Sequence, residues 1–323
     1  MADEKKLYPF RFLPADVEKD WGGERFSLAD LGYLDSMVGN GWFGGNTLSE
    51  LMQTYLERVV GDTSFEFYGT QFPVMVKQLD VRGRTSLRVN ADDTAAAERY
   101  DAFGKTALWY VAEAREDAVL YVGFDREVTS EEFFNACTGN TVEGLLRKVR
   151  PEAGDAFLIP PGTVHAAAGK VKIVEVAECS DLYFRLHDWG AGTSGLHLEE
   201  AFDLIDFRPW DPLLRRRPDS SGMRSVLAST EQFTVSGLRL SEPLRLTRGE
   251  SDSFLLYVCV RGGAFLDIVE GDWEGERRYR LQEGEVLLVP SEITDFLLAP
   301  EKRDTFLLEA GLDPRTAKDS YLG

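Results

Sequence analysis

The chain has 323 residues, of which 43% are hydrophobic and 28% are charged. These values are ordinary for a folded globular protein and exclude a single small module, a disordered chain and a collagen-like repeat. The formal net charge of −19 makes nucleic acids and anionic membranes poor partners for the molecule as a whole.

The sequence predicts neither a secretion signal nor a membrane segment. Its first six residues are hydrophilic, and no stretch approaches ~18 uninterrupted apolar residues. The three cysteines, Cys137, Cys179 and Cys259, form no C-x-x-C pair, and we expect them to be reduced thiols in the core. Together these features predict a cytoplasmic protein.

Two helical segments are expected in the N-terminal half of the chain. Apolar residues recur at spacings of three and four within residues 46–60, and Thr47 with Glu50 forms a capping box before them. A second capping box begins at Thr129 and predicts a helical segment over residues 129–148. Both segments interrupt a chain that is otherwise typical of β-structure.

Short segments rich in Val, Ile, Tyr and Phe, bounded by Gly, Pro or Asp, predict the strands. In the N-terminal half they cover residues 72–79, 85–90, 108–112, 118–122, 156–159, 171–176 and 182–187. After about residue 222 they cover residues 254–260, 263–269, 279–281 and 286–289. Many short strands at this spacing favour a β-barrel or sandwich.

A weak internal repeat predicts two copies of one β-architecture. Residues 154–160 and 284–290 both contain a glycine, an acid, four apolar residues and a proline. The segment 208–221 contains three prolines and three consecutive arginines, and we interpret it as a linker. We therefore expect an N-terminal domain over 1–207 and a degenerate C-terminal domain over 222–323.

The first copy of the repeat carries a candidate metal ligand. It continues as Gly154-x5-Pro160-x-Gly162-x2-His165, which fits the second signature motif of cupins. Proline fixes φ and glycine permits a tight turn, so the His165 imidazole is expected to stand on rigid backbone at the mouth of a small barrel. His187 and His197 are more readily explained as structural residues.

More of the chain resembles type I phosphomannose isomerases, which are zinc-dependent bicupin enzymes that interconvert mannose 6-phosphate and fructose 6-phosphate. The resemblance covers about the first 200 residues and rests on segments at residues 8–10, 21–23, 45–51, 72–77, 104–110, 159–166 and 180–189. It implies a mainly β fold of two cupin-type jelly-roll barrels, with the helical segments as insertions in the N-terminal half.

The resemblance also implies a zinc tetrad of glutamine, histidine, glutamate and histidine. At these four positions the chain has Arg88, Asn90, Ala107 and His165. Alanine offers no ligand atom, asparagine is a weak ligand and guanidinium repels a dication, so zinc is expected to bind weakly or not at all. Rescue of the metal site by other side chains stays open, the candidates being Asp92, Glu175 and His187.

The side of the site that binds the organic substrate is better preserved. The resemblance places Lys105 at the active-site lysine and Arg185 at the catalytic arginine of the family, and Lys77 lies in the strand before Arg88. These cations would form a basic spot suited to a phosphate or carboxylate. The alternative is that they are surface ion-pair partners. One further departure is Glu178, at a position where the family has glutamine.

Two functions therefore stand side by side. The chain is either a mannose 6-phosphate isomerase-type enzyme or a catalytically inactive bicupin that binds a sugar phosphate or another small anion. In a metal-free enzyme, Arg88 would supply the positive charge, Arg185 would assist and His165 would act as base. A scaffold that forms a homodimer is a third interpretation, which no motif supports.

Overall fold

The computed structural model describes residues 6–192, 194–249, 253–271, 273 and 275–312. The chain divides into two compact units, each of which contains sequence-distant segments. Unit 1 comprises Met1–Ala15, Phe26–Val76 and Pro218–Gly323, and unit 2 comprises Asp16–Arg25 and Lys77–Arg217. No helix in the described part of the chain is both long and apolar enough to cross a bilayer.

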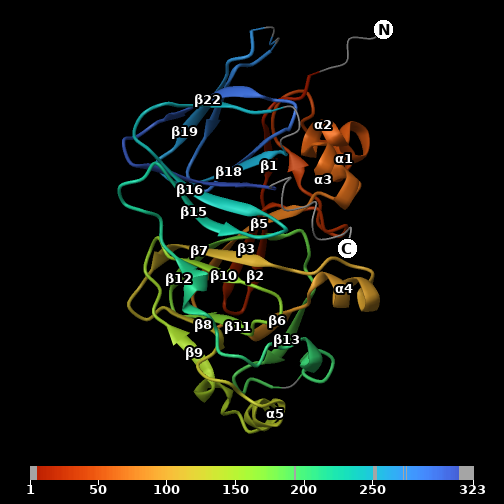
Figure 1. The fold of residues 1–323 in the computed structure, drawn as a ribbon, viewed down its shortest axis with the longest axis vertical. Coiled ribbons are helices and arrows are strands. Elements are labelled where there is room, and N and C mark those ends of the chain that lie inside the picture. Colours follow the sequence, from red (N-terminus) through yellow and green to blue (C-terminus); the bar gives the residue numbers. More distant parts are fainter. Residues whose placement is uncertain (1–5, 193, 250–252, 272, 274, 313–323) are drawn as a thin grey trace. The chain divides into compact units, whose positions relative to one another are not determined.

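Unit 2 is built on two β-sheets (Figure 1). The strands of the larger sheet, in spatial order, are β14 (Arg215–Arg216), β10 (Ala156–Ile159), β7 (Ala107–Ala114), β12 (Val171–Glu178), β5 (Val74–Val81), β3 (Gly22–Leu28) and β2 (Ala15–Lys19). Those of the smaller sheet are β13 (Tyr183–His187), β6 (Leu87–Asn90), β11 (His165–Ala168), β8 (Val119–Phe124) and β9 (Leu146–Val149). The boundary between the units falls inside β3 and β5.

The two sheets of unit 2 enclose an apolar core. Alternate residues of β7, β10 and β12 point into it, among them Trp109, Phe157 and Ile173, and they pack against Leu120 and Val122 of β8. This alternation follows from the two-residue side-chain period of a strand. The mainly β fold with facing sheets, expected from the sequence, is thereby confirmed.

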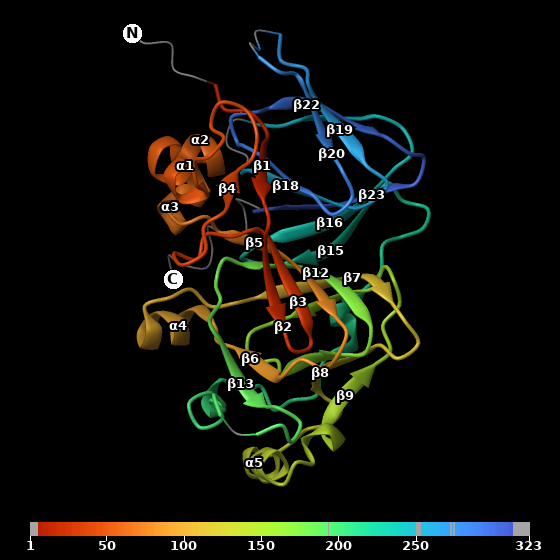
Figure 2. The same ribbon diagram turned by 180° about the vertical axis from the view of Figure 1, so that it is seen from behind.

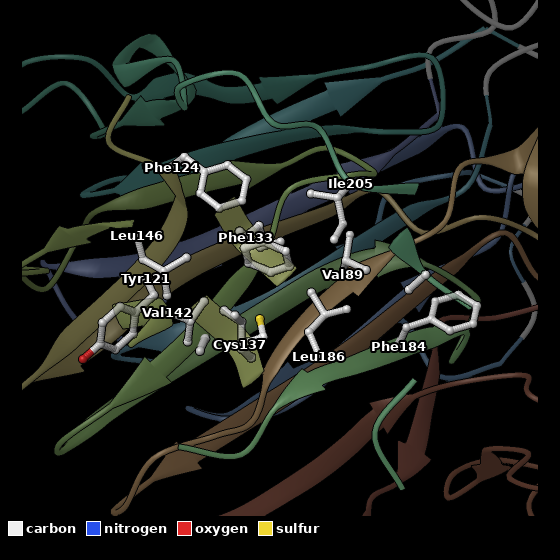
Figure 3. Packing of buried hydrophobic residues seen from close by; sticks show 14 of the residues in the cluster. Val89, Tyr121, Phe124, Phe133, Cys137, Val142, Leu146, Phe184, Leu186 and Ile205 are labelled. Atoms are coloured by element: carbon white, nitrogen blue, oxygen red, sulfur yellow. The ribbon is translucent and has the colours of Figure 1, made fainter. Parts of the chain in front are cut away.

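The outer face of the smaller sheet is covered by helical segments (Figure 3). Helix α5 (Ser130–Thr138) places Phe133 and Cys137 against Phe124, Val89 and Leu186. The short 3-10 helices η1 (Val142–Gly144) and η2 (Phe202–Leu204) lie beside this cluster, whereas α4 (Asp93–Tyr100) follows β6. Because this face is apolar and covered, the polar side chains of the smaller sheet are left on its inner face.

Unit 1 repeats the two-sheet arrangement (Figure 2). Its larger sheet contains β15 (Arg224–Ser229), β16 (Thr234–Leu240), β23 (Thr305–Gly311), β18 (Leu255–Arg261), β21 (Val286–Val289), β1 (Phe10–Leu13) and β4 (Met37–Val38). Its smaller sheet contains β17 (Leu244–Thr247), β22 (Asp295–Pro300), β19 (Ala264–Ile268) and β20 (Arg278–Leu281). Three helices precede β5, namely α1 (Leu48–Tyr55), α2 (Glu57–Val60) and α3 (Asp62–Tyr68).

The boundaries of the two compact units differ from those of the expected domains, 1–207 and 222–323. Strand β1 pairs with β21 through Phe10 and Leu288, and Arg58 of α2 forms an ion pair with Glu292 at 2.6 Å. Residues 26–76 therefore pack with the C-terminal segment, because long-range pairing rather than chain order fills the edge of that sheet.

The predicted linker 208–221 is in part a structural element. After the 3-10 helix η3 (Pro212–Leu214), Arg215 and Arg216 form β14, which pairs antiparallel with β10. Arg215 and Arg217 bind the buried Asp155 carboxylate at 2.6 and 2.8 Å. These ion pairs therefore hold Arg215 and Arg217 against unit 2 and keep the segment from being a free linker.

Both predicted helical segments are shorter than expected. The capping box of Thr47 and Glu50 is present, but Leu56, at φ 44°, separates α1 from α2. Helix α5 begins after Thr129 as predicted and ends at Thr138, and Leu146 to Val149, expected to be helical, form β9. The edge of the smaller sheet at β8 supplies the hydrogen-bond partners that turn this apolar segment into a strand.

Candidate functional site

The inner face of the smaller sheet in unit 2 collects the predicted site residues. Arg88 of β6 lies directly opposite His165 of β11 on one side and Arg185 of β13 on the other. Asn90 lies opposite Tyr183 in the same pair of strands. Directly opposed residues share a face of a sheet, so these five residues lie on one face of the three strands.

The facing sheet contributes acids and lysines. Glu175 of β12 lies opposite Trp109 of β7, and the Trp109 indole N–H donates to Glu175 Oε2 at 2.7 Å. Lys77 comes from β5, Glu24 from β3, and Lys105 from the segment just before β7. Lys77 and Lys105 are 2% and 3% exposed, which excludes the alternative that they are surface ion-pair partners.

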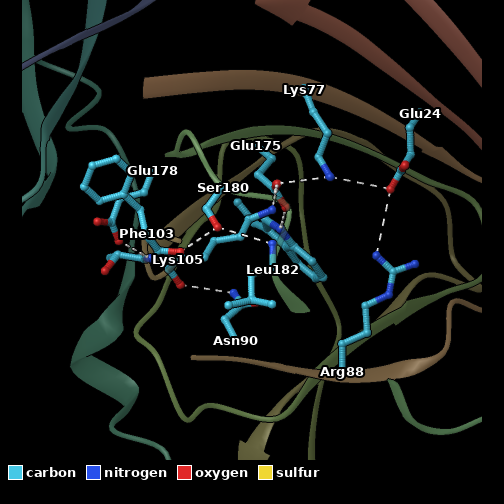
Figure 4. Close-up of polar contacts among 12 residues, drawn as sticks. Glu24, Lys77, Arg88, Asn90, Phe103, Lys105, Glu175, Glu178, Ser180 and Leu182 are labelled. Atoms are coloured by element: carbon cyan, nitrogen blue, oxygen red, sulfur yellow. Dashed lines mark hydrogen bonds and ion pairs between the residues drawn. The ribbon is translucent and has the colours of Figure 1, made fainter. Parts of the chain in front are cut away.

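These side chains line a small polar pocket (Figure 4). Its lining consists of Trp21, Glu24, Lys77, Leu79, Thr85, Arg88, Asn90, Lys105, Trp109, His165, Glu175 and Tyr183. The cavity volume is about 20 Å³, enough for roughly one water molecule. Three cations face two carboxylates among the lining residues, so the lining itself has a net positive charge in an acidic protein, and Asp181 lies near enough to act on both lysines.

Glu175 is the centre of the ion network. Its Oε1 lies 3.1 Å from Lys105 Nζ and 3.4 Å from Lys77 Nζ. Burial alone would raise the pKa of Glu175, but the two ammonium groups and the Trp109 N–H hold this pKa well below its usual range. Glu175 is therefore an anion at neutral pH and a poor general base.

The network extends to Glu24 and Arg88. Glu24 Oε1 lies 3.6 Å from Lys77 Nζ and 3.8 Å from the Arg88 guanidinium. The guanidinium carbon of Arg88 lies 4.5 Å from the centre of the Tyr183 ring, in cation–π contact. Burial lowers the pKa of Lys105, whereas the charges of Glu175 and Glu24 overcome burial and raise the pKa of Lys77.

His165 is held by the turn that the sequence predicts. Gly162, at φ 81°, donates its N–H to Asn90 O, and a Cβ at this glycine would lie 2.9 Å from Leu204 O. His165 Nδ1 lies 2.9 Å from Thr163 O, so Nδ1 carries a proton and Nε2 is the acceptor. Burial lowers the pKa of His165 to about 4, which keeps the imidazole neutral at pH 7.

The other ligand positions of the resemblance are occupied by groups with partners of their own. Asn90 turns its amide N–H toward Lys105 O at 3.2 Å, and Ala107 is buried at 1% exposure. Asp92 caps α4 by accepting from Ala95 N–H at 2.7 Å. No cluster of three or more His, Cys, Asp and Glu suited to a metal ion occurs among the residues that the structure describes.

Arg185 lies beside the pocket rather than in its lining. It neighbours Arg88 in register, but its guanidinium is paired with Asp188 and its side chain is 34% exposed. His187, the other candidate on this strand, accepts from Trp189 N–H at its Nδ1. The pocket therefore unites Lys77, Arg88, Lys105 and His165, and leaves Arg185 at its margin.

Sequence reasoning did not predict Glu24 or Trp21 as members of the pocket. Glu24 follows Gly22 and Gly23 in a strand that the propensity pattern did not indicate, and Trp21 precedes them. Glu24 lies at two-residue spacing from Phe26 and Leu28, and this shared strand face is the sequence signal that could have identified it as a buried acid. The acid matters because it is the second counter-charge of Lys77.

Two facing sheets in each unit, with a polar pocket inside one barrel, define a protein of the bicupin class. The chain is 27% identical to mannose-6-phosphate isomerase ManA of Bacillus subtilis over 319 residues, which cover 90% of this chain and 95% of that protein. It is 26% identical to mannose-6-phosphate isomerase of Streptococcus mutans over 284 residues, covering 86% of this chain and 85% of that protein. No family model matches.

Solved structures agree on the fold. The mannose 6-phosphate isomerase of Bacillus subtilis superimposes with a TM-score of 0.80 at 23% identity, over 94% of this chain and 99% of that chain. A mutant of phosphomannose isomerase from Salmonella typhimurium gives a TM-score of 0.76 at 14% identity, over 94% and 99% of the two chains. In sequence over most of its length, and in fold, the chain is thus similar to mannose-6-phosphate isomerases.

Proposed function

We propose that this isomerase-like chain binds a hexose phosphate, or an anion of similar chemistry, in the Lys77–Lys105–Arg88 pocket without zinc and without isomerising it. Two features of the pocket support the proposal. Three buried or half-buried cations line it, and only one of the four ligand positions implied by the family resemblance holds an imidazole.

The side chains around His165 do not fit zinc. Structural and catalytic zinc sites use three or four donors of N, S or carboxylate type. Here Arg88 presents a permanent cation, Asn90 uses its amide N–H on Lys105 O, and Ala107 has no donor atom. A single imidazole leaves the donor set incomplete, so the proposal assigns no step to a metal.

The protonation states disfavour isomerisation. Moving a proton between two carbons requires a base whose pKa lies near the working pH. His165, with its pKa lowered to about 4, is a weak base at neutral pH. Arg88, which would have to stabilise the developing oxyanion, is instead directed at Glu24 and Tyr183.

The charges of the pocket favour an anionic ligand. Lysine and arginine are the usual partners of phosphate, and burial strengthens their attraction. A hexose phosphate needs more room than the cavity of about 20 Å³ offers, so some lining residues have to move on binding. Arg88 and Tyr183, which are only half-buried, are the side chains best placed to do so.

We propose a cytoplasmic location for the chain, where thiols are kept reduced. All three cysteines are buried and none forms a disulfide. A persistent lack of disulfides among buried thiols is usual in the cytosol.

The proposal is tested on the untagged wild-type protein with three measurements. Elemental analysis should give far less than one zinc per chain. Calorimetric titration with mannose 6-phosphate should show binding that Arg88→Gln weakens about tenfold, a typical loss for one charge-assisted contact. A coupled assay should show no conversion of mannose 6-phosphate to fructose 6-phosphate, with or without added zinc.

The matched control restores the ligand set. The triple variant Arg88→Gln, Asn90→His and Ala107→Glu should bind about one zinc per chain, since it recreates the tetrad beside His165. Near-stoichiometric zinc in the wild type, or turnover, would overturn the claim that the chain works without metal and isomerisation. Absence of binding of mannose 6-phosphate, fructose 6-phosphate and inorganic phosphate would overturn the ligand assignment.

A further inference from the structure

The main chain of Lys105 is held by the end of β6. Its N–H donates to Ala91 O at 3.0 Å, and its carbonyl accepts from Asn90 Nδ2 at 3.2 Å. Gly104 precedes it, and a Cβ there would lie 2.5 Å from the backbone of Asp92 and Asp93. The segment is therefore pressed against the start of α4, where only glycine fits.

Two carboxyl groups hold the amides on either side of Lys105. Gly104 N–H donates to Asp93 Oδ1 at 2.9 Å, and Thr106 N–H donates to Glu178 Oε2 at 2.6 Å. Asp93 belongs to α4 and Glu178 to the end of β12, so the two acids reach the segment from different elements. Figure 4 shows Glu178 beside this segment, on the opposite side of Lys105 from Glu175.

The carboxyl groups of Asp93 and Glu178 accept from amides only two residues apart, and the negative charge of Asp93 acts on Glu178. Two carboxyl groups brought this close in a buried place repel each other unless one of them keeps a proton. Glu178 is 2% exposed, and its burial together with the negative charge of Asp93 raises its pKa to about 8. At neutral pH the pair therefore holds one proton.

The remaining charges near Glu178 are directed elsewhere. The ammonium of Lys105, on the same segment, contacts Glu175 at 3.1 Å. Asp181, which follows β12, acts on Lys77 and Lys105. The proton shared with Asp93 thus replaces the cation that a buried carboxylate usually needs.

We propose that Glu178 is a positioning residue for Lys105: the proton shared by Glu178 and Asp93 locks the 101–106 segment against the pocket, and its loss in alkaline solution releases Lys105 and weakens anion binding. This inference rests on the proposed function, because it concerns regulation of the same pocket. Once both acids are ionised, their repulsion opposes the close approach that the two amide contacts require.

The decisive variant is Glu178→Gln, which is isosteric. The glutamine oxygen still accepts from Thr106 N–H, and its amide N–H donates to Asp93 without any titratable proton. Affinity for mannose 6-phosphate, measured by calorimetry, should fall about tenfold between pH 7 and pH 9 in the wild type, as expected for one proton linked to binding. In Glu178→Gln the affinity should fall by at most about twofold over the same pH range.

A second measurement needs no ligand. Hydrogen exchange of the peptide covering residues 101–110, corrected for the intrinsic effect of pH, should accelerate above pH 8 in the wild type and stay protected in Glu178→Gln. Asp30→Asn is the matched control. Asp30 is another buried acid of raised pKa, and it accepts from Phe72 N–H in unit 1. Its variant should leave both readouts as in the wild type.

Equal pH dependence of exchange in the wild type and Glu178→Gln would overturn the positioning role. If no probe binds at any pH, the ligand assignment fails, but exchange still decides whether the Glu178–Asp93 pair locks the segment. If binding is present and its pH dependence is unchanged in Glu178→Gln, the segment does not control the pocket.

Discussion

His165 is held rigidly, and the residues that the structure describes form no cluster around it that is suited to a metal ion. The turn at Gly162 and the bond from Nδ1 to Thr163 O orient the ring. Trp109 packs against it edge to face at 5.3 Å between ring centres. His165 is therefore rigid, neutral and buried. Protonating it in the folded state costs free energy when the pH falls.

We therefore expect the unfolding free energy of the protein to decrease in acid. Because burial lowers the pKa of His165 to about 4, the unfolded chain binds a proton at a higher pH than the folded chain. Folded-state stability from this group is complete above its unfolded pKa of ~6.5 and is lost as the pH falls from there toward 4. The loss amounts to roughly 3 kcal/mol.

Urea unfolding of the wild type and of His165→Gln at pH 7 and pH 4.5 measures this loss. The difference in unfolding free energy between the two pH values should shrink in His165→Gln and remain in His197→Gln, a half-buried control on the loop after β13. An identical pH dependence in His165→Gln and the wild type would show that His165 is not held neutral.

At the scale of elements, local signals set where helices begin but not where they end. Thr47 and Thr129 both cap helices with their side chains, accepting from the amide of the residue three positions later. The far ends depend on packing: Leu56 adopts φ 44°, and Leu146 pairs with Phe124. A leucine in this conformation is strained by ~1 kcal/mol or more, which surrounding contacts have to offset.

The capping box gives an element-scale prediction. Thr47→Ala removes the side-chain acceptor of Glu50 N–H and half of the reciprocal cap. We expect a loss of about 1 kcal/mol in the unfolding free energy, and almost none in Thr47→Ser, which keeps the hydroxyl. Urea denaturation measures both variants. A loss in Thr47→Ser equal to that in Thr47→Ala would assign the effect to the methyl group instead.

At the scale of the whole molecule, the repeat extends beyond the two glycine turns. In β10, Phe157 lies opposite Trp109, which lies opposite Glu175. In β21, Leu287 lies opposite Tyr257, which lies opposite Glu309. Tyr257 donates its hydroxyl to Glu309 Oε2 at 2.8 Å, as Trp109 donates to Glu175 at 2.7 Å. Each barrel therefore keeps one acid bound by an aromatic donor.

Glu175 and Glu309 differ in the cations that they bind. Glu175 binds buried lysines, whereas Glu309 binds Arg224, which is 44% exposed. Glu309→Gln should cost roughly 1–3 kcal/mol of unfolding free energy and leave the affinity for mannose 6-phosphate within about twofold of the wild type. Glu175→Gln should cost more, roughly 3–5 kcal/mol, because it leaves two buried ammonium groups without their counter-charge, and should change the affinity at least about tenfold.

Urea unfolding and calorimetry at pH 7 measure these two effects, with circular dichroism to check that both variants fold. A similar change in affinity in both variants would mean that the second barrel also contributes to the ligand site. A neutral effect of Glu175→Gln on binding would remove Glu175 from the pocket that we describe.

The sequence by itself determined the fold class, the strands around the repeat and the start of each capped helix, because turns, caps and side-chain alternation are local properties. Only the tertiary structure decided that residues 26–76 pack with the C-terminal segment, that residues 146–149 form a strand, and that Glu24, Lys77, Lys105 and Glu175 meet in one pocket. These outcomes depend on which distant strand edges pair and on which charges burial forces together, and neither is encoded within a short window of the chain.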